Sequence, residues 1–96
     1  MSAYVVVQLD FKPGPELDAY RQLAGAAILK YGGRFLVRGK DKLINEDDLP
    51  RPSKVMLMEF ESGEAAMRWY RSPEYAEALE LRQRAMVREL FIVDAG

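Results

Sequence analysis

The chain has 96 residues, of which 49% are hydrophobic, and this length supports one domain with a single core. Its 14 basic and 15 acidic residues give a formal net charge of −1, so no overall field attracts nucleic acid or an anionic membrane. Cysteine and histidine are both absent, which excludes disulfides, thiolate nucleophiles, imidazole bases, zinc sites built on these residues and histidine-ligated haem.

The first part of the chain predicts a strand, a helix and a second strand. Apolar residues alternate from Ala3 to Phe11, which is typical of a strand. From Glu16 to Tyr31 apolar residues recur at steps of three and four, which predicts a helix with one buried side and with Gly32 as its C-terminal cap. Alternation returns from Gly33 to Lys40 and predicts the second strand.

The polar segment Asp41 to Pro52 is interrupted by prolines and predicts a loop or a frayed continuation of the strand. Its length is typical of a functional flap, and its role stays open at this point. Its acidic residues Glu46, Asp47 and Asp48 lack the alternating spacing and the glycine of a calcium-binding loop. We therefore interpret them as solvated and predict no metal site.

The second part predicts a strand from Lys54 to Glu61, a short helix from Ser62 to Tyr70, a longer helix from Ser72 to about Met86, and a strand from Glu89 to Val93. A serine cap followed by proline and glutamate marks the start of the longer helix. The element order predicts an α+β, ferredoxin-like βαββαβ fold in a single domain over residues 1–96. In this fold a four-stranded antiparallel sheet carries the helices on one face.

Both faces of the predicted sheet contain apolar residues. The first strand places Tyr4 and Val6 opposite its main apolar row, and the third strand does the same with Val55 and Leu57. The helices can cover only one face, so the simplest cover for the other is a second copy of the chain. We predict a homodimer in which the two sheets pack face to face.

Two motifs stand out in the chain: Tyr31-Gly32-Gly33-Arg34-Phe35-Leu36-Val37-Arg38-Gly39 and Trp69-Tyr70-Arg71-Ser72-Pro73-Glu74-Tyr75. With these motifs the chain resembles the family catalogued as domain of unknown function thirteen-thirty. The resemblance extends to the opening strand, the strand that ends in Glu59-Phe60, and Arg82. The resemblance covers nearly the whole chain and implies the dimeric α+β barrel superfamily, although the family has no assigned reaction. The wider superfamily includes cofactor-free oxygenases, isomerases, haem enzymes and ligand-sensing modules, and the lack of histidine disfavours the haem enzymes.

Arg34 and Arg38 share a parity in the second strand. If Phe35 and Val37 face the helices, both guanidiniums point into the space between the two sheets. Glu59, in the neighbouring strand, has the parity to pair with either arginine. Two interpretations stay open: an ion pair that sets the register or the dimer interface, and a pocket whose arginine holds a carboxylate, phosphate or enolate oxygen.

Aromatic residues gather around the break between the two predicted helices, where Trp69, Tyr70 and Tyr75 could line a cleft for a planar ligand or could form core. Trp69 and Tyr70 are adjacent on a helix, so at most one of them lines any given pocket. Arg82 has no acidic residue one helical turn away, which favours a tertiary partner. Arg88 is expected to be a solvated charge at the helix end.

Three functional hypotheses follow. In the first, the dimer binds a small anionic or aromatic molecule in a cleft between sheet and helices, with Arg38 and Arg82 holding its charge and the aromatic residues as walls. In the second, it is an enzyme of oxygenase, isomerase or lyase type without a cofactor, which acts on an enolisable or phenolic substrate. Arg38 would stabilise an oxyanion, and Glu59 and Asp10 are the candidate proton acceptors, although pairing with an arginine would make Glu59 a poor base. In the third, the dimer is purely structural.

The expected partners are therefore a second copy of the chain and a small ligand, without nucleic acid, membrane or cofactor. Met1-Ser2-Ala3 lacks the basic start of a signal peptide, and the longest apolar run is too short to span a membrane. We expect a cytoplasmic protein.

Overall fold

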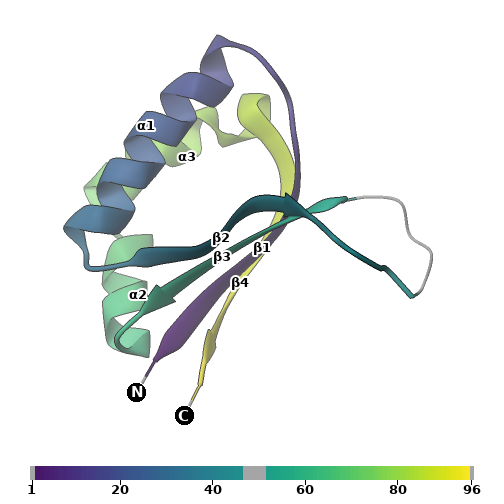
Figure 1. The fold of residues 1–96 in the computed structure, drawn as a ribbon. Coiled ribbons are helices and arrows are strands. Elements are labelled where there is room, and N and C mark those ends of the chain that lie inside the picture. Colours follow the sequence, from purple (N-terminus) through teal and green to yellow (C-terminus); the bar gives the residue numbers. More distant parts are fainter. Residues whose placement is uncertain (1, 47–51, 96) are drawn as a thin grey trace.

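The computed structural model describes residues 2–46 and 52–95. The elements are β1 (Ala3–Phe11), α1 (Pro15–Lys30), β2 (Arg34–Asp41), β3 (Lys54–Phe60), α2 (Gly63–Tyr70), α3 (Pro73–Ala85) and β4 (Met86–Asp94). The strands form one antiparallel sheet in the order β2-β3-β1-β4, and the helices lie on one face of it (Figure 1). The predicted ferredoxin-like α+β fold is confirmed. No helix of the described residues is long and apolar enough to cross a membrane.

The ends of the helices lie at the glycine and serine residues that the sequence predicts as caps. Gly32 has φ +83°, the left-handed conformation that ends α1. Between α2 and α3, the Ser72 hydroxyl donates to the Trp69 carbonyl at 2.7 Å and accepts from the Tyr75 N–H at 3.1 Å. Ser72 therefore closes one helix and caps the next, as its position before proline predicts.

The last strand is longer than predicted. It begins at Met86, directly after Ala85 ends α3, instead of at Glu89. The Lys12 N–H donates to the Ala85 carbonyl at 2.8 Å, so a segment distant in sequence holds the change from helix to strand. Arg88 consequently lies in the sheet, and its assignment to the end of a helix is wrong.

The core lies between the sheet and the helices. The β1 residues Ala3, Val5, Val7 and Leu9 are buried in alternation, which confirms the predicted parity of this strand. Their neighbours in the core include the large side chains of Phe60, Trp69 and Tyr75. The packing is close, because a Cβ added to Gly33 would lie 2.6 Å from the Phe60 ring.

Irregular pairing between β2 and β3 changes which way the β2 side chains point. The aligned pairs are Arg34 with Glu59, Phe35 with Met58, Val37 with Leu57, and Arg38 with Met56. Leu36 is an extra residue, and such a bulge reverses the alternation after it. Val37 therefore lies with Leu57 on the uncovered face, and Arg38 lies with Met56 on the helix-covered face. The prediction that Arg38 points away from the helices is wrong; for Arg34 it holds.

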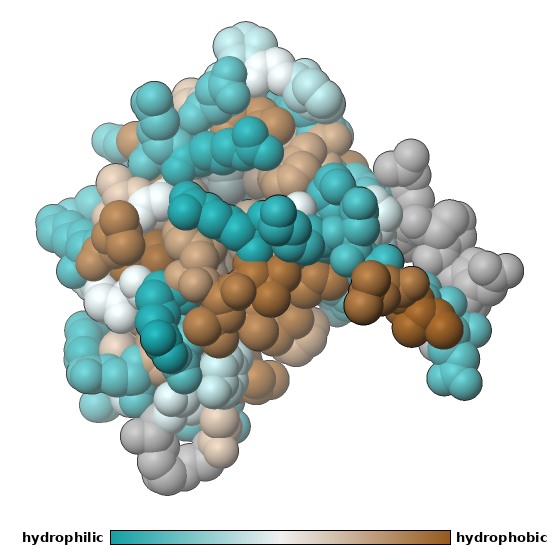
Figure 2. Space-filling view, in the orientation of Figure 1, coloured by the Kyte–Doolittle hydropathy of each residue, from teal (hydrophilic) through white to brown (hydrophobic). Residues whose placement is uncertain are grey.

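The face of the sheet opposite the helices, called the open face below, is largely apolar. Its apolar residues include Tyr4, Val6, Val37, Val55, Leu57, Val87, Phe91 and Val93. Phe91 and Val93 are 40% and 43% exposed. Figure 2 shows apolar side chains gathered beneath β2 and continuing onto the loop after it, where Leu43 and Ile44 are almost fully exposed. Burying this surface requires a partner.

The described residues after β2, 42–46, project beyond the sheet (Figure 1), and hydrogen bonds hold the base of this segment. Lys42 donates from Nζ to Gln8 Oε1 at 2.8 Å, and Ser53 donates from its N–H and its hydroxyl to Asp10 Oδ1 at 3.0 and 2.7 Å. Asp47 and Asp48 lie outside the described residues, so the solvated acidic loop stays a prediction. Residues 2–46 and 52–95 contain no group of three or more acidic side chains placed to hold a metal ion.

Candidate functional site

A cavity of about 340 Å³, called the α1–β2 cleft below, opens between α1 and one edge of the sheet. The lining residues from α1 are Tyr20, Arg21, Ala24, Gly25 and Ile28, and those from the sheet are Phe11, Phe35, Arg38, Gly39 and Met56. The walls are mostly apolar and aromatic, with a few polar groups, as is typical of a small-molecule site. The bulge in β2 is what brings Arg38 to this side of the sheet.

Two guanidinium groups lie over aromatic rings in this cleft. Cζ of Arg38 is 4.1 Å from the centroid of the Phe35 ring, and Cζ of Arg21 is 4.7 Å from that of Phe11. No described carboxylate forms an ion pair with either arginine. A guanidinium stacked on a ring keeps its in-plane N–H donors available for a planar anion. The cleft therefore carries two positive charges that no described carboxylate neutralises in an ion pair.

Gly39 lets the Phe11 ring form part of the cleft. It sits at the second irregularity of β2, has φ +66°, and a Cβ added there would lie 3.1 Å from the Phe11 ring. Glycine is suited to this left-handed position in a bulge. The backbone and the ring approach closely, which fixes the end of the cleft nearest the loop.

Behind the cleft, Tyr20 reaches polar groups of α3 and β4. Arg88 Nη1 donates to the Tyr20 hydroxyl at 3.4 Å. Burial, with Tyr75 as the next contribution, raises the pKa of Tyr20 well above its usual range, although Arg88 and Arg82 act in the opposite direction. Tyr20 therefore stays protonated, whereas the expected tertiary partner of Arg82 stays a prediction.

The three aromatic residues of the helix break do not line the α1–β2 cleft. Trp69 and Tyr75 are each 1% exposed, with ring centroids 4.4 Å apart, whereas Tyr70 is 39% exposed. Trp69 Nε1 and the Tyr75 hydroxyl are buried without a hydrogen-bond partner in the described part of the chain. A buried polar atom without a hydrogen bond lowers the stability of the fold. These two side chains therefore belong to the core even though their polar atoms are unfavourably buried.

Glu59 pairs with Arg34 rather than with Arg38. Arg34 Nε donates to Glu59 Oε1 at 2.7 Å, on the open face. The hydrogen bond from Arg34 is the main cause that lowers the pKa of Glu59, so this carboxylate is a poor general base, as expected. Neither residue lies in the α1–β2 cleft.

The structure thus places the predicted site residues in different parts of the molecule rather than in one site. Of the six proposed ligand contacts, Arg38 alone lines the α1–β2 cleft. The sequence interpretation missed Arg21 and Gly25. Their spacing of four residues, which places them on the same side of a helix, is a signal that could have identified them.

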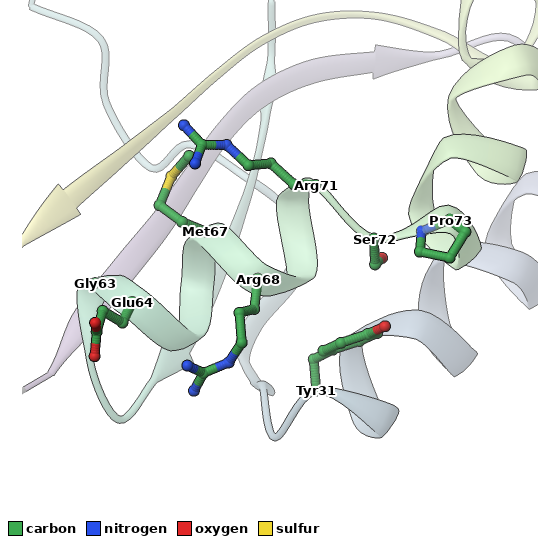
Figure 3. Close-up of a pocket in the computed structure, with 8 residues that line it drawn as sticks. All are labelled: Tyr31, Gly63, Glu64, Met67, Arg68, Arg71, Ser72 and Pro73. Carbon is green, nitrogen blue, oxygen red and sulfur yellow. The ribbon is translucent and has the colours of Figure 1, made fainter.

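A second, more open groove of about 670 Å³ lies between the end of α1 and the break between α2 and α3. Arg68 and Tyr31 lie on one side of α2 there, whereas Met67 and Arg71 lie on the other (Figure 3). Tyr31 already donates its hydroxyl to Glu74 Oε1 at 2.8 Å. We assign the candidate site to the α1–β2 cleft, because it is better enclosed and because its two guanidiniums lie over aromatic rings.

Glu74, Lys30 and Tyr31 interact beside this groove, and their interaction predicts that the free energy of unfolding depends on pH in the acid range. Hydrogen bonds from Lys30 and Tyr31 lower the pKa of Glu74 from 4.5 to about 2. A carboxylate with a lowered pKa stabilises the fold above its unfolded-state pKa, and this stabilisation is lost as the pH falls from about 4.5 through about 2. We expect Glu74→Gln to lose less stability than the wild type over this range, in urea unfolding at stepped pH. The exposed Glu77→Gln should follow the wild-type curve; parallel curves for all three proteins would contradict the prediction.

Comparison with known proteins identifies the family and the fold. The family model described as "Domain of unknown function (DUF1330)" matches residues 2–95. No curated protein matches the chain. Among solved structures, the RPA0582 protein of unknown function from Rhodopseudomonas palustris is 21% identical with a TM-score of 0.72, over 99% of this chain and 82% of that one.

Two other solved structures share the fold. SnoaB, a cofactor-independent oxygenase from Streptomyces nogalater, is 17% identical with a TM-score of 0.65, over 99% of this chain and 93% of that one. A dimeric ferredoxin-like protein of unknown function from Jannaschia sp. CCS1 is 13% identical with a TM-score of 0.64, over 99% of this chain and 100% of that one. At these identities the likeness concerns the fold.

Proposed function

The chain belongs to the DUF1330 family of domains of unknown function, and from this premise we propose that it is a homodimer that binds a small anionic or aromatic molecule in the α1–β2 cleft. The observation that carries the proposal is the pair of guanidiniums, Arg21 and Arg38, stacked on aromatic rings without an ion-pair partner in the described chain. A cytoplasmic location belongs to the same proposal and remains a prediction from the sequence.

The open face supports the dimer. Its apolar side chains are left uncovered by the helices, which all lie on the other face. A stable interface buries roughly 1,200–2,000 Å² in total, and a sheet face is a natural unit for that area. The Jannaschia protein of the same fold is described as dimeric. Packing of two open faces would produce the α+β barrel that the family resemblance implies.

In this proposal Arg38 is the main contact for the ligand's charge, and Arg21 is the second. Arg88 donates a hydrogen bond to the Tyr20 hydroxyl, so that the Tyr20 ring forms an inner wall of the cleft. Trp69 and Tyr75 belong to the buried core. Arg34 keeps Glu59 charged on the open face and has no direct role in binding.

The test is the affinity for carboxylates, phosphates and phenolates, first screened by thermal shift and then measured by calorimetry. We expect Arg38→Met, which keeps the apolar stem, to weaken binding by about 10- to 100-fold, because a hydrogen-bonded charge contributes about 1.5–3 kcal/mol. Arg34→Met serves as the control and should bind as the wild type does. A wild type that binds no anion, or an Arg38→Met variant with unchanged affinity, would overturn the proposal.

A second candidate is an enzyme without a cofactor that acts on a phenolic or enolisable substrate. The shared fold with SnoaB, described as a cofactor-independent oxygenase, favours it. Arg38 would stabilise the developing oxyanion of a bound phenolate. Consumption of a cleft ligand in air by the wild type, but not by Arg38→Met, would support this candidate. Stable binding without turnover would support the binding protein alone.

A further inference from the structure

Gly25 lies in the middle of α1 and lines the α1–β2 cleft. After proline, glycine is the least favourable residue in a helix interior, because it adds backbone freedom to the unfolded chain and contributes no side chain. A Cβ added at Gly25 would meet no heavy atom within 4 Å. No protein atom near this position therefore requires a glycine.

The other described glycines each have a local reason. Gly14, Gly32 and Gly39 have positive φ angles. A Cβ on Gly33 would lie 2.6 Å from the Phe60 ring, and one on Gly63 would lie 3.0 Å from Asp94 Oδ2. Gly25 is the exception among them, and the space that its missing side chain leaves is part of the cleft. A molecule that uses the cleft could lie directly against the backbone of α1 there.

The groups around this space define what would fit it. Arg21 lies one helical turn before Gly25 and on the same side of α1, whereas Arg38 faces the cleft from β2. The remaining surface near Gly25 is apolar and includes Ile28 and Met56. An open space beside a bare helix backbone and apolar side chains suits a flat ring, and two guanidiniums that line the same cleft suit a planar carboxylate.

We propose that the ligand of the α1–β2 cleft is a planar aromatic carboxylate of one or two rings. Its ring lies flat against the α1 backbone at Gly25, and its carboxylate lies between Arg21 and Arg38. The volume of about 340 Å³ is near the lower end for small-molecule sites, which limits the ligand to this size. This inference rests on the proposed binding function and specifies the ligand class of the same site.

Calorimetry on the full chain with four probes tests the shape of the ligand. The probes are benzoate, 2-naphthoate, cyclohexanecarboxylate and inorganic phosphate. Cyclohexanecarboxylate carries the charge of benzoate on a puckered ring, so a flat slot should bind it at least about 10-fold more weakly than the better aromatic acid. Phosphate, which has no ring, should bind more weakly still.

Substitutions at Gly25 test where the ring lies. Gly25→Leu should fill the slot and weaken binding of the aromatic acid by about 10- to 200-fold. Ala26→Leu places the same side chain at the next, exposed position of α1 and should leave the affinity unchanged. Gly25→Ala should raise the unfolding temperature, because the position tolerates a methyl group, and circular dichroism of Gly25→Leu should show a folded protein, so that its loss is one of binding.

The possible outcomes distinguish a failure of this inference from a failure of the proposed anion-binding function. If no anion binds the wild type, both are overturned. If anions bind and Arg38→Met loses them, but Gly25→Leu retains full affinity, the ligand does not lie on α1 and only the inference is overturned. The inference would also be overturned if cyclohexanecarboxylate or phosphate bound as tightly as the aromatic acids. The site would then recognise the negative charge of the ligand but not a flat ring.

Discussion

Replacing Leu57 with glutamate is expected to convert the proposed dimer into a monomer. Leu57 lies on an inner strand of the sheet, aligned with Val37 on one side and Val6 on the other, in the middle of the apolar open face. Face-to-face packing would bury the new carboxylate of each copy without a partner, at a cost of several kcal/mol. The dissociation constant should rise by more than about 100-fold, since about 1.4 kcal/mol corresponds to each tenfold change.

Sedimentation velocity at micromolar concentration measures this change. Leu29→Glu is the matched control, because Leu29 is a leucine of α1 that is 70% exposed, and we expect that variant to remain a dimer. Circular dichroism should show both variants folded. A folded Leu57→Glu variant that still sediments as a dimer would show that the copies associate through another surface, and a monomeric wild type would remove the dimer altogether.

Trp69→Ala is expected to lower the free energy of unfolding by about 3–5 kcal/mol, which is the usual cost of removing a large buried aromatic side chain. Trp69 is 1% exposed and packs on Phe60 and Tyr75, with ring centroids 5.4 and 4.4 Å apart. The adjacent Tyr70 is 39% exposed, so Tyr70→Ala should cost much less, about 1 kcal/mol. Two neighbouring aromatic residues of one helix thus differ strongly in their contribution to stability.

Urea unfolding followed by far-ultraviolet circular dichroism measures both variants. This signal is needed because Trp69 is the single tryptophan of the chain, and its fluorescence disappears with it. Trp69→Phe should recover part of the loss, because a ring remains in the core and the unpaired Nε1 is removed. Equal losses for Trp69→Ala and Tyr70→Ala would contradict the burial of Trp69.

The proposed ligand binding and the proposed dimerisation use opposite faces of the same sheet. Arg38 lies on the helix-covered face and Leu57 on the open face, although the two residues belong to neighbouring strands. The Leu36 bulge separates them, because it turns Val37 toward the open face and Arg38 toward α1. Ligand affinity and assembly are therefore expected to respond to different substitutions.

The sequence by itself determined the elements whose signals are local. The alternation of apolar residues from Ala3 to Phe11 predicted the bounds of β1. Ser72, which is followed by proline, marked the break between α2 and α3. The order of the elements then predicted the ferredoxin-like sheet, because few topologies accommodate that order. The apolar open face was also predictable, since strand alternation assigns each residue to a face.

Tertiary structure alone decided where the functional groups lie. The bulge at Leu36 arises from the pairing of β2 with β3, and strict alternation within β2 does not encode it. It moved Arg38 to the helix side and left Arg34 as the partner of Glu59. Similarly, the hydrogen bond from Lys12 to Ala85 set the start of β4 and so brought Arg88 to Tyr20. Each of these outcomes depends on contacts between residues far apart in the chain, whereas periodicity reports only on neighbours.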